Sequence, residues 1–330
     1  MATGSGELRM TQATRRHEEA SIGAATARAD WRGFTASEVA AGARASEFDD
    51  VDAGRLSVER KFAAVLRQNG IATFEALFEL RGGVCVRRIK NRSTTRIALS
   101  DGGGCRSLYL KRHERPRWRE RLRPLLNFGR PIFGARNEWL AILALREASV
   151  PTLTALCFGE HDGRSLLITE DLRTDVTLLD WVNRCSGGAA SRAIDAARKR
   201  ATIRDLARLT RRMHDARIFH QDFFLHHILA RGDFGRLDMR VIDPGRALRE
   251  PRLPRRWIVK DLAQLNFSAR NLPCADRLLF LRLYLGRPFR RSDRILARVI
   301  AMKSSRIAAH TAKHGLWVAG DWEAASGRAD

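Results

Sequence analysis

Two aspartates in the stretch 219–246 constrain this chain more than any other feature of its sequence. Asp222 follows His220 by two positions, and His227 comes five positions after Asp222. Asp243 stands at the end of the short apolar run Val241-Ile242. Phosphoryl transfer from ATP uses one carboxylate to orient and deprotonate a hydroxyl, and a second to hold the Mg²⁺ that bridges the β- and γ-phosphates. The pattern therefore predicts Asp222 as the catalytic base and Asp243 as a ligand of Mg²⁺.

Two charged residues upstream occur in the order that the same chemistry requires. Residues 108–111 have the pattern of a strand that ends in Lys111, and Glu138 begins a segment with apolar residues at helical spacing. A strand lysine that pairs with a helix glutamate places its ammonium group on the α- and β-phosphates of ATP. The order Lys111, Glu138, Asp222, Asp243 is that of protein-kinase-like folds. The alternatives are that Lys111 is one more charge in a basic run and that Glu138 is an exposed residue of a first helical turn.

The elements around these residues predict an α+β fold with two lobes. The N-lobe is a small antiparallel sheet with strands at 84–90, 95–99 and 106–111, and the C-lobe is mostly helical. The apolar strand 166–172 leads into a polar linker. In a two-lobed kinase fold this linker is the hinge, where we expect the backbone near Glu170 and Leu172 to meet the adenine. Helices are expected at 56–68, 178–182, about 190–216, 275–284 and 292–312.

The turn after the first of these strands, Asn91-Arg92-Ser93, lies where kinases fold a glycine-rich loop over the phosphates, but it contains no glycine. The side chains and backbone of Asn91, Ser93 and Thr94 are candidate replacements. The alternative is a plain hairpin turn with no contact to a ligand.

A literal copy of the metal-binding tripeptide of protein kinases occurs at Asp233-Phe234-Gly235. Asp233 lies only 11 residues after Asp222, and two strands should separate the catalytic loop from the metal ligand. We therefore interpret the tripeptide as the turn between strands at 227–230 and 237–242. Asp243, which comes 21 residues after Asp222, leaves room for this hairpin.

The residues that follow argue against a regulated protein kinase. Only 18 residues separate Asp243 from Asp261, too few for a long activation segment, so a small or lipid-linked hydroxyl is the expected acceptor. Asp261 is expected to brace the backbone of the catalytic loop, and His220 to support the same loop. His227 either binds a second Mg²⁺ or forms a hydrogen bond with Asp243. The spacing of the nearby histidines matches no common zinc motif.

Charge and composition limit the partners. The chain of 330 residues carries 60 Lys and Arg against 37 Asp and Glu, a net charge of +23. Such a charge attracts polyanions, anionic membrane surfaces or phosphorylated substrates; the alternative is a proteome rich in Arg. We expect an anionic membrane surface as a peripheral partner and no nucleic acid. Five scattered cysteines and no apolar run of about 20 residues favour a cytoplasmic chain without a membrane span.

Four parts are expected along the chain. Residues 1–54 are rich in small and polar residues and are expected to be a disordered or loosely structured extension. Residues 55–172 form the N-lobe with the ATP-binding sheet, residues 173–314 form the helical C-lobe with the catalytic and metal-binding loops, and residues 315–330 form a tail. Nothing in the sequence indicates an oligomeric state.

From about residue 80 to 285 the chain resembles the lipopolysaccharide kinase family, which includes the Kdo and core-heptose kinases of Gram-negative envelopes. The resemblance rests on His227 in place of a more common Asn, on Gly245-Arg246-Ala247 after Asp243, on the segment 260–265 and on Glu138-Trp139. It implies ATP- and Mg²⁺-dependent phosphorylation of a sugar hydroxyl, on heptose or Kdo, in the lipid A–core precursor at the inner face of the cytoplasmic membrane. Gln221 and Pro244 depart from the family pattern.

Two other functions remain open at this point. One is a kinase-like phosphotransferase that acts on another small molecule or on a protein. The other is a catalytically inactive basic binding module, which the presence of Lys111, Asp222 and Asp243 disfavours.

Overall fold

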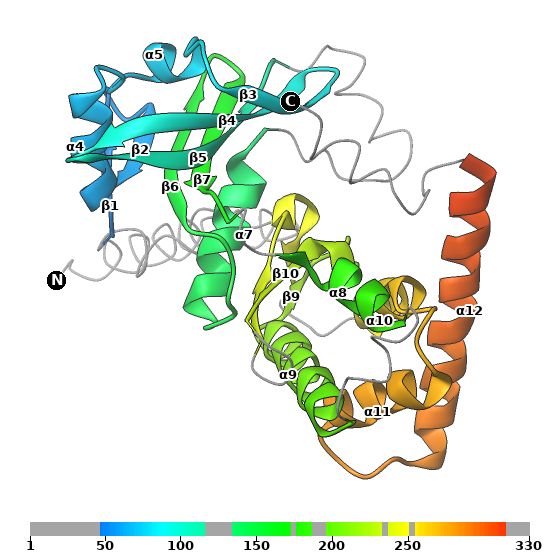
Figure 1. Cartoon of the computed structure of the whole chain (residues 1–330). Coiled ribbons are helices and arrows are strands. Elements are labelled where there is room, and N and C mark those ends of the chain that lie inside the picture. The colour runs from blue at the N-terminus through cyan, green and yellow to red at the C-terminus, as the bar shows by residue number, and fades with distance from the viewer. Residues whose placement is uncertain are drawn as a thin grey trace, which may run out of the picture.

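The computed structural model describes residues 47–115, 134–172, 176–186, 196–232, 237–250 and 255–314. These residues form an N-lobe built on one large sheet and a helical C-lobe, with one helix, α7, between them (Figure 1). The α+β, two-lobed architecture expected from the sequence is confirmed. Within these residues no helix is long and apolar enough to cross a membrane.

The N-lobe sheet has seven strands in the order β1-β2-β6-β7-β5-β4-β3, and each neighbouring pair is antiparallel. Leu108 and Leu110 of β5 and Ile97 and Leu99 of β4 are buried on one face, in a core shared with α4 (Arg60–Gln68) and α5 (Phe74–Phe78). Residues between them in sequence project from the opposite face, toward α7. The strands are β1 (Phe48–Val51), β2 (Leu56–Glu59), β3 (Val84–Ile89), β4 (Arg92–Asp101), β5 (Gly104–His113), β6 (Ala155–His161) and β7 (Arg164–Glu170).

Three details of the N-lobe differ from the sequence-based expectation. The helix expected at 56–68 begins only at Arg60, because residues 56–59 form β2 and pair with both β1 and β6. The strand β1 lies inside the stretch assigned to the extension, and Phe48 packs edge-on against Trp139 with ring centroids 6.1 Å apart. The tight turn between β3 and β4 consists of residues 90 and 91, so Arg92 and Ser93 belong to β4. Residues 1–46 of the expected extension and the tail 315–330 lie outside the described residues.

Helix α7 (Arg136–Glu147) is buried on all sides from Glu138 to Leu145, rather than along one apolar stripe as its spacing suggested. A helix that is apolar all round is typical of a fully enclosed position. Here the N-lobe sheet covers one side of α7, and elements of the C-lobe cover another (Figure 1). The helix therefore contacts both lobes.

The C-lobe confirms the expected helices at 275–284 and 292–312, which are α11 and α12, and the described part of the helix expected from about 190. Its elements are β8 (Val176–Thr177), α8 (Leu178–Ser186), α9 (Ala196–Asp215), β9 (Ile218–Phe219), the 3₁₀ turn η3 (Leu225–His227), β10 (Ile228–Arg231), β11 (Asp238–Val241), the 3₁₀ turn η4 (Pro244–Arg246), β12 (Leu248–Arg249), α10 (Arg255–Ser268), α11 (Cys274–Leu285) and α12 (Arg291–His314). Two small sheets, β11-β10-β8 and β12-β9, carry the loops that face α7.

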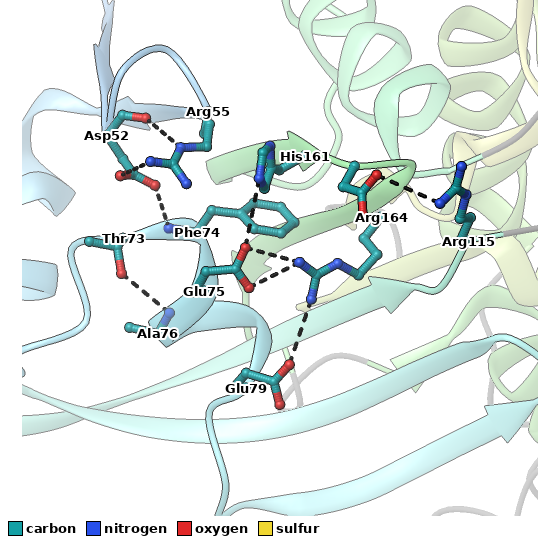
Figure 2. Close-up of polar contacts among 11 residues, drawn as sticks. Asp52, Arg55, Thr73, Phe74, Glu75, Ala76, Glu79, Arg115, His161 and Arg164 are labelled. Carbon is teal, nitrogen blue, oxygen red and sulfur yellow. Dashed lines mark hydrogen bonds and ion pairs between the residues drawn. The ribbon is translucent and has the colours of Figure 1, made fainter.

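An ion-pair network fixes α5 to the hairpin between β6 and β7 (Figure 2). Both carboxylate oxygens of Glu75 accept hydrogen bonds from Arg164, at 2.9 and 3.0 Å, and Glu79 lies 3.6 Å from the same guanidinium. Arg164 also lies over the ring of Phe78, 4.9 Å from its centroid. Asp52 accepts a hydrogen bond from the backbone N–H of Phe74 at the start of α5. This network is remote from the predicted site, and it stabilises the outer end of the N-lobe.

Candidate active site

The expected Lys–Glu pair is formed. Lys111 projects from β5 toward α7, and its Nζ donates a hydrogen bond of 2.5 Å to Oε1 of Glu138, which is buried. The same Nζ lies 3.7 Å from Oδ1 of Asp243 in the C-lobe. Burial alone lowers the pKa of Lys111, but the two carboxylates outweigh it and raise the pKa above its usual value. Lys111 is therefore a fixed positive charge between the two lobes.

Asp243 stands at the start of η4 with a left-handed backbone, φ +54°. Its carboxylate is 45% exposed and faces Lys111. The charge of Lys111, against the opposing effect of burial, lowers the pKa of Asp243 to about 2. The carboxylate is thus ionised at neutral pH and accessible, which are two requirements for a Mg²⁺ ligand.

His227 connects the two predicted catalytic aspartates. Its Nδ1–H donates a hydrogen bond of 2.7 Å to the backbone carbonyl of Asp222. Because this hydrogen bond places a proton on Nδ1, a neutral ring presents the lone pair of Nε2 on its other side. Nε2 lies 3.9 Å from Oδ2 of Asp243. The ring is oriented as that of a metal-binding histidine would be.

Helix α10 holds the backbone of the catalytic loop with one face. Asp261 is fully buried and accepts hydrogen bonds of 2.9 Å from the N–H groups of His220 and Gln221. One turn later, Gln264 accepts from the N–H of Phe223 and donates to the carbonyl of Gln221. Ser268 accepts from the N–H of Leu225. The expectation that Asp261 braces this loop is confirmed, and two further residues of the same helix share the task.

His220 ties the catalytic loop to the strand that leads to Asp243. Its Nε2–H donates a hydrogen bond of 3.0 Å to the carbonyl of Ile242, and burial lowers the pKa of the ring. A buried neutral imidazole in this place positions the two loops relative to each other. Asp261 also accepts from Nε2 of His214, at 3.3 Å, so the brace extends to α9.

The Asp222 carboxylate is partly exposed at the end of this braced loop. Beside this loop, Nζ of Lys260 in α10 donates a hydrogen bond of 2.9 Å to Oε1 of Gln221. Burial lowers the pKa of Lys260, and the charge of Asp222 acts in the opposite direction. A carboxylate on a backbone that is held in place by hydrogen bonds can accept a proton from a bound hydroxyl.

Glu170 and Leu172 lie where β7 leaves the sheet, between the lobes. The carboxylate of Glu170 accepts a hydrogen bond of 2.8 Å from the N–H of Thr154, and it lies 3.5 Å from Arg240 of β11. The side chain of Glu170 therefore links the lobes. A contact between the backbone of Glu170 or Leu172 and an adenine stays a prediction.

Asp233 lies outside the described residues, but the strands that flank it are described. Arg231 of β10 pairs with Asp238 of β11, so the tripeptide falls in the connection of a hairpin, as expected. Asn137, the residue before Glu138, is a further residue of the site that was not predicted from the sequence. Its side-chain amide donates to the carbonyls of Gly245 and Ala247, both at 3.0 Å, and so fixes the loop after Asp243 to α7. Its only sequence signal is an amide in the first turn of a buried helix.

The described residues contain no cluster of three or more His, Cys, Asp or Glu side chains able to hold a metal ion. The arrangement suits Mg²⁺, which commonly takes one or two protein carboxylates together with substrate phosphates. A site built only from protein ligands, such as a zinc centre, is not present among these residues.

Residues 75–284 match the model of the lipopolysaccharide kinase (Kdo/WaaP) family. The chain belongs to this family. The family and the kinase activity expected from the sequence are thereby confirmed.

Curated relatives cover most of the chain. The lipopolysaccharide core heptose(I) kinase WaaP of Escherichia coli K12 is 33% identical over 273 residues, which are 78% of this chain and the whole of that protein. The protein of the same name from Pseudomonas aeruginosa PAO1 is 36% identical over 262 residues, 75% of this chain and 92% of the relative. A solved structure described as WaaP in complex with acyl carrier protein superimposes with a TM-score of 0.61 at 32% identity, over 76% of this chain and 97% of that one.

Proposed function

We propose that this member of the family transfers the γ-phosphoryl group of ATP to a heptose hydroxyl of the lipopolysaccharide core. The observation that carries the proposal is the convergence of Lys111, Glu138 and Asp243 beside the loop of Asp222. Relatives that the chain matches over 92% and 100% of their length are heptose(I) kinases, which favours heptose over Kdo. These kinases act on the core, so the lipid A–core precursor is the proposed partner.

The protein residues divide the chemistry between them. Asp222 orients the acceptor hydroxyl and takes its proton as the sugar oxygen bonds to the γ-phosphorus and the bond from that phosphorus to the oxygen of ADP breaks. Lys111, held by Glu138, binds the α- and β-phosphates. His220 and Asp261 hold the loop so that Asp222 keeps its place.

Magnesium fits the residues beside Lys111. Asp243 supplies an ionised, accessible carboxylate, and His227 supplies either a second ligand or a hydrogen bond to a metal-bound water. Bound Mg²⁺ would neutralise charge that develops on the phosphates. Imidazole is a poorer ligand for Mg²⁺ than oxygen, so Asp243 is the principal ligand in this proposal.

The acceptor is lipid-linked, and we propose that the chain works at the inner face of the cytoplasmic membrane as a peripheral protein. Its net charge of +23 supports this proposal. The densest basic segment, around Arg115 to Arg123, lies outside the described residues except for Arg115 itself, as does Arg252 of the second segment.

An acyl carrier protein is a second proposed partner. The solved relative is a complex with one, and the C-lobe of this chain contains a largely apolar cavity of about 690 Å³ among α8, α9, α10, α11 and α12. A cavity of this size and character suits an acyl chain. Titration with acylated and unacylated acyl carrier protein tests the proposal. We expect the acylated form to bind more tightly. Equal affinities for the two forms would contradict a role for the cavity, and no binding of either form would contradict the proposal of an acyl carrier protein as a partner.

The proposed chemistry is tested by purified variants with lipid A–core acceptor and ATP. Asp222→Ala should lower kcat by roughly 10²–10⁴, the usual contribution of a general base. Asp243→Ala should abolish Mg²⁺-dependent turnover. Asp233→Ala is the control and should keep wild-type turnover, since Asp233 belongs to the hairpin connection. Normal turnover in Asp222→Ala, or an inactive Asp233→Ala, would contradict the assignment.

A further inference from the structure

The turn between β3 and β4 contains no glycine. The register of the strands nevertheless places four basic residues, Arg87, Arg92, Lys111 and His113, on the face of the sheet that looks toward α7. Thr94 pairs with Lys111, and Arg92 pairs with His113 across β4 and β5. On the edge strand, Arg87 pairs with Thr94. Paired residues in an antiparallel sheet project from the same face. Arg87, Arg92 and His113 therefore project from the same face as Lys111.

The charges of Arg87 and Arg92 act on carboxylates of the predicted site. The positive charge of Arg87 acts on the carboxylate of Asp243, as the larger effect of Lys111 does. The charge of Arg92 acts on Glu138, against the larger effect of burial. Between them, Arg87 and Arg92 therefore act on the two carboxylates that also face Lys111.

Unlike Lys111, the other three residues lack side-chain partners among the described residues. Among the described residues, neither Arg87 nor Arg92 has a carboxylate within 4.0 Å. Nδ1 of His113 is shielded from solvent and has no hydrogen-bond partner in the same part of the chain. Burial, and then the charges of Arg92 and Lys111, lower the pKa of His113 to about 4, so the ring is neutral at physiological pH. Buried polar atoms of native proteins normally have partners.

We propose that Arg87, Arg92 and His113 bind the phosphates of the nucleoside triphosphate, in the place that a glycine-rich loop occupies in other kinases. The proposal rests on the proposed kinase function. A guanidinium group binds phosphate oxygens with two parallel hydrogen bonds, and a neutral imidazole adds one more. Side-chain cations thus replace the backbone N–H groups that a glycine-rich loop would supply. The two-residue turn at 90 and 91 is too short to fold over a ligand itself.

The chain supplies a matched control on the same strand. Arg88 is adjacent to Arg87, carries the same charge and is also exposed, but it pairs with Ser93 and so projects from the opposite face. Its charge contributes to lowering the pKa of Arg112, after the larger effect of burial. Replacing Arg88 changes the net charge of the protein equally and leaves the proposed phosphate-binding face intact.

The test measures nucleotide affinity without the acceptor, by calorimetric titration of the full-length protein with Mg²⁺-ATP and with adenosine. We expect Arg92→Gln and Arg87→Gln each to weaken ATP binding by about tenfold and the double variant by more, with adenosine binding unchanged. Arg88→Gln should match the wild type. His113→Ala should weaken ATP binding by a smaller factor. Arg92→Lys keeps the positive charge and should recover part of the ATP affinity that Arg92→Gln loses. Such a recovery would show that a substitution at this position does not unfold the strand.

Three results would overturn the inference. The ATP affinity of both glutamine variants could remain that of the wild type. Arg88→Gln could lose as much affinity as Arg87→Gln, so that only the net charge matters. The variants could instead raise the KM for the sugar acceptor while ATP binding stays constant, which would assign the face to the acceptor. Failure of the proposed function has a different signature, because the wild type would then bind ATP but phosphorylate no core heptose.

Discussion

His227 offers the sharpest test at the scale of single residues. Its Nδ1 donates to the carbonyl of Asp222 and its Nε2 faces Asp243. An asparagine can do both tasks, because its amide N–H donates and its carbonyl oxygen suits Mg²⁺. We therefore expect His227→Asn to keep kcat within about tenfold of the wild type and His227→Ala to lose roughly 10–100-fold in Mg²⁺ affinity or rate, the usual effect of losing a group that supports a metal.

Turnover as a function of Mg²⁺ concentration measures both effects. Equal losses in the Asn and Ala variants would contradict this role and would indicate that the imidazole serves the acceptor instead. His226→Asn is a suitable comparison, because His226 adjoins His227, whereas the hydrogen bond to the carbonyl of Asp222 comes from His227.

The proximity of three charged residues was predicted correctly from the sequence. Lys111, Glu138 and Asp243 were inferred from their order along the chain, and the structure brings them together. Arg92 was placed in a turn, and His113 was not considered. Their importance depends on which face of the sheet they occupy. That face is set by the register between strands, and a shift of one residue reverses it, so sequence order alone does not reveal it.

At the scale of elements, α10 shows how a helix acts as a template for a loop. Asp261, Gln264 and Ser268 recur at the spacing of one helical face, and each bonds backbone groups of the catalytic loop. In the sequence these three are only some of the polar residues of the helix, and Asp261 alone was predicted to brace the loop. The polar side chains satisfy buried N–H groups of an irregular loop, which would otherwise be costly. Which buried N–H groups need an acceptor can be seen only in the folded structure, where the position of the loop is known.

The strands β1 and β2, which were not predicted from the sequence, are short or have conflicting patterns. Three of the four residues of β1 are Asp or Val, with Phe48 the single buried aromatic, and β2 adjoins a helix without a turn signal. Both strands exist because each pairs with a neighbour in the sheet. Long helices and the strands of the β3–β5 meander were predicted correctly, since their periodicity extends over enough residues to decide the element type.

At the scale of the whole molecule, the two-lobed architecture followed from the order of four motifs, whereas the role of the charge did not. A net charge of +23 is consistent with membrane attachment and equally with an Arg-rich proteome. The described residues include no membrane-spanning helix. In the proposed peripheral attachment, each Arg near an anionic surface contributes about 1 kcal/mol, and salt screens this attraction beyond a Debye length.

We expect the protein to sediment with vesicles that contain phosphatidylglycerol at low salt and to be released as the salt concentration rises. It should not bind vesicles of phosphatidylcholine. Replacing Arg115, Arg117, Arg119, Arg121 and Arg123 with Gln should weaken vesicle binding several-fold while sparing turnover of a soluble acceptor. A control with five other arginines replaced, Arg282, Arg291, Arg294, Arg298 and Arg306, has the same net charge of +18, since 23 − 5 = 18. If both variants lose binding equally, the membrane responds to total charge and not to the segment 115–123. If the wild type stays in solution with anionic vesicles at low salt, peripheral attachment is wrong, and the excess charge must serve another polyanion or reflect the composition of the proteome.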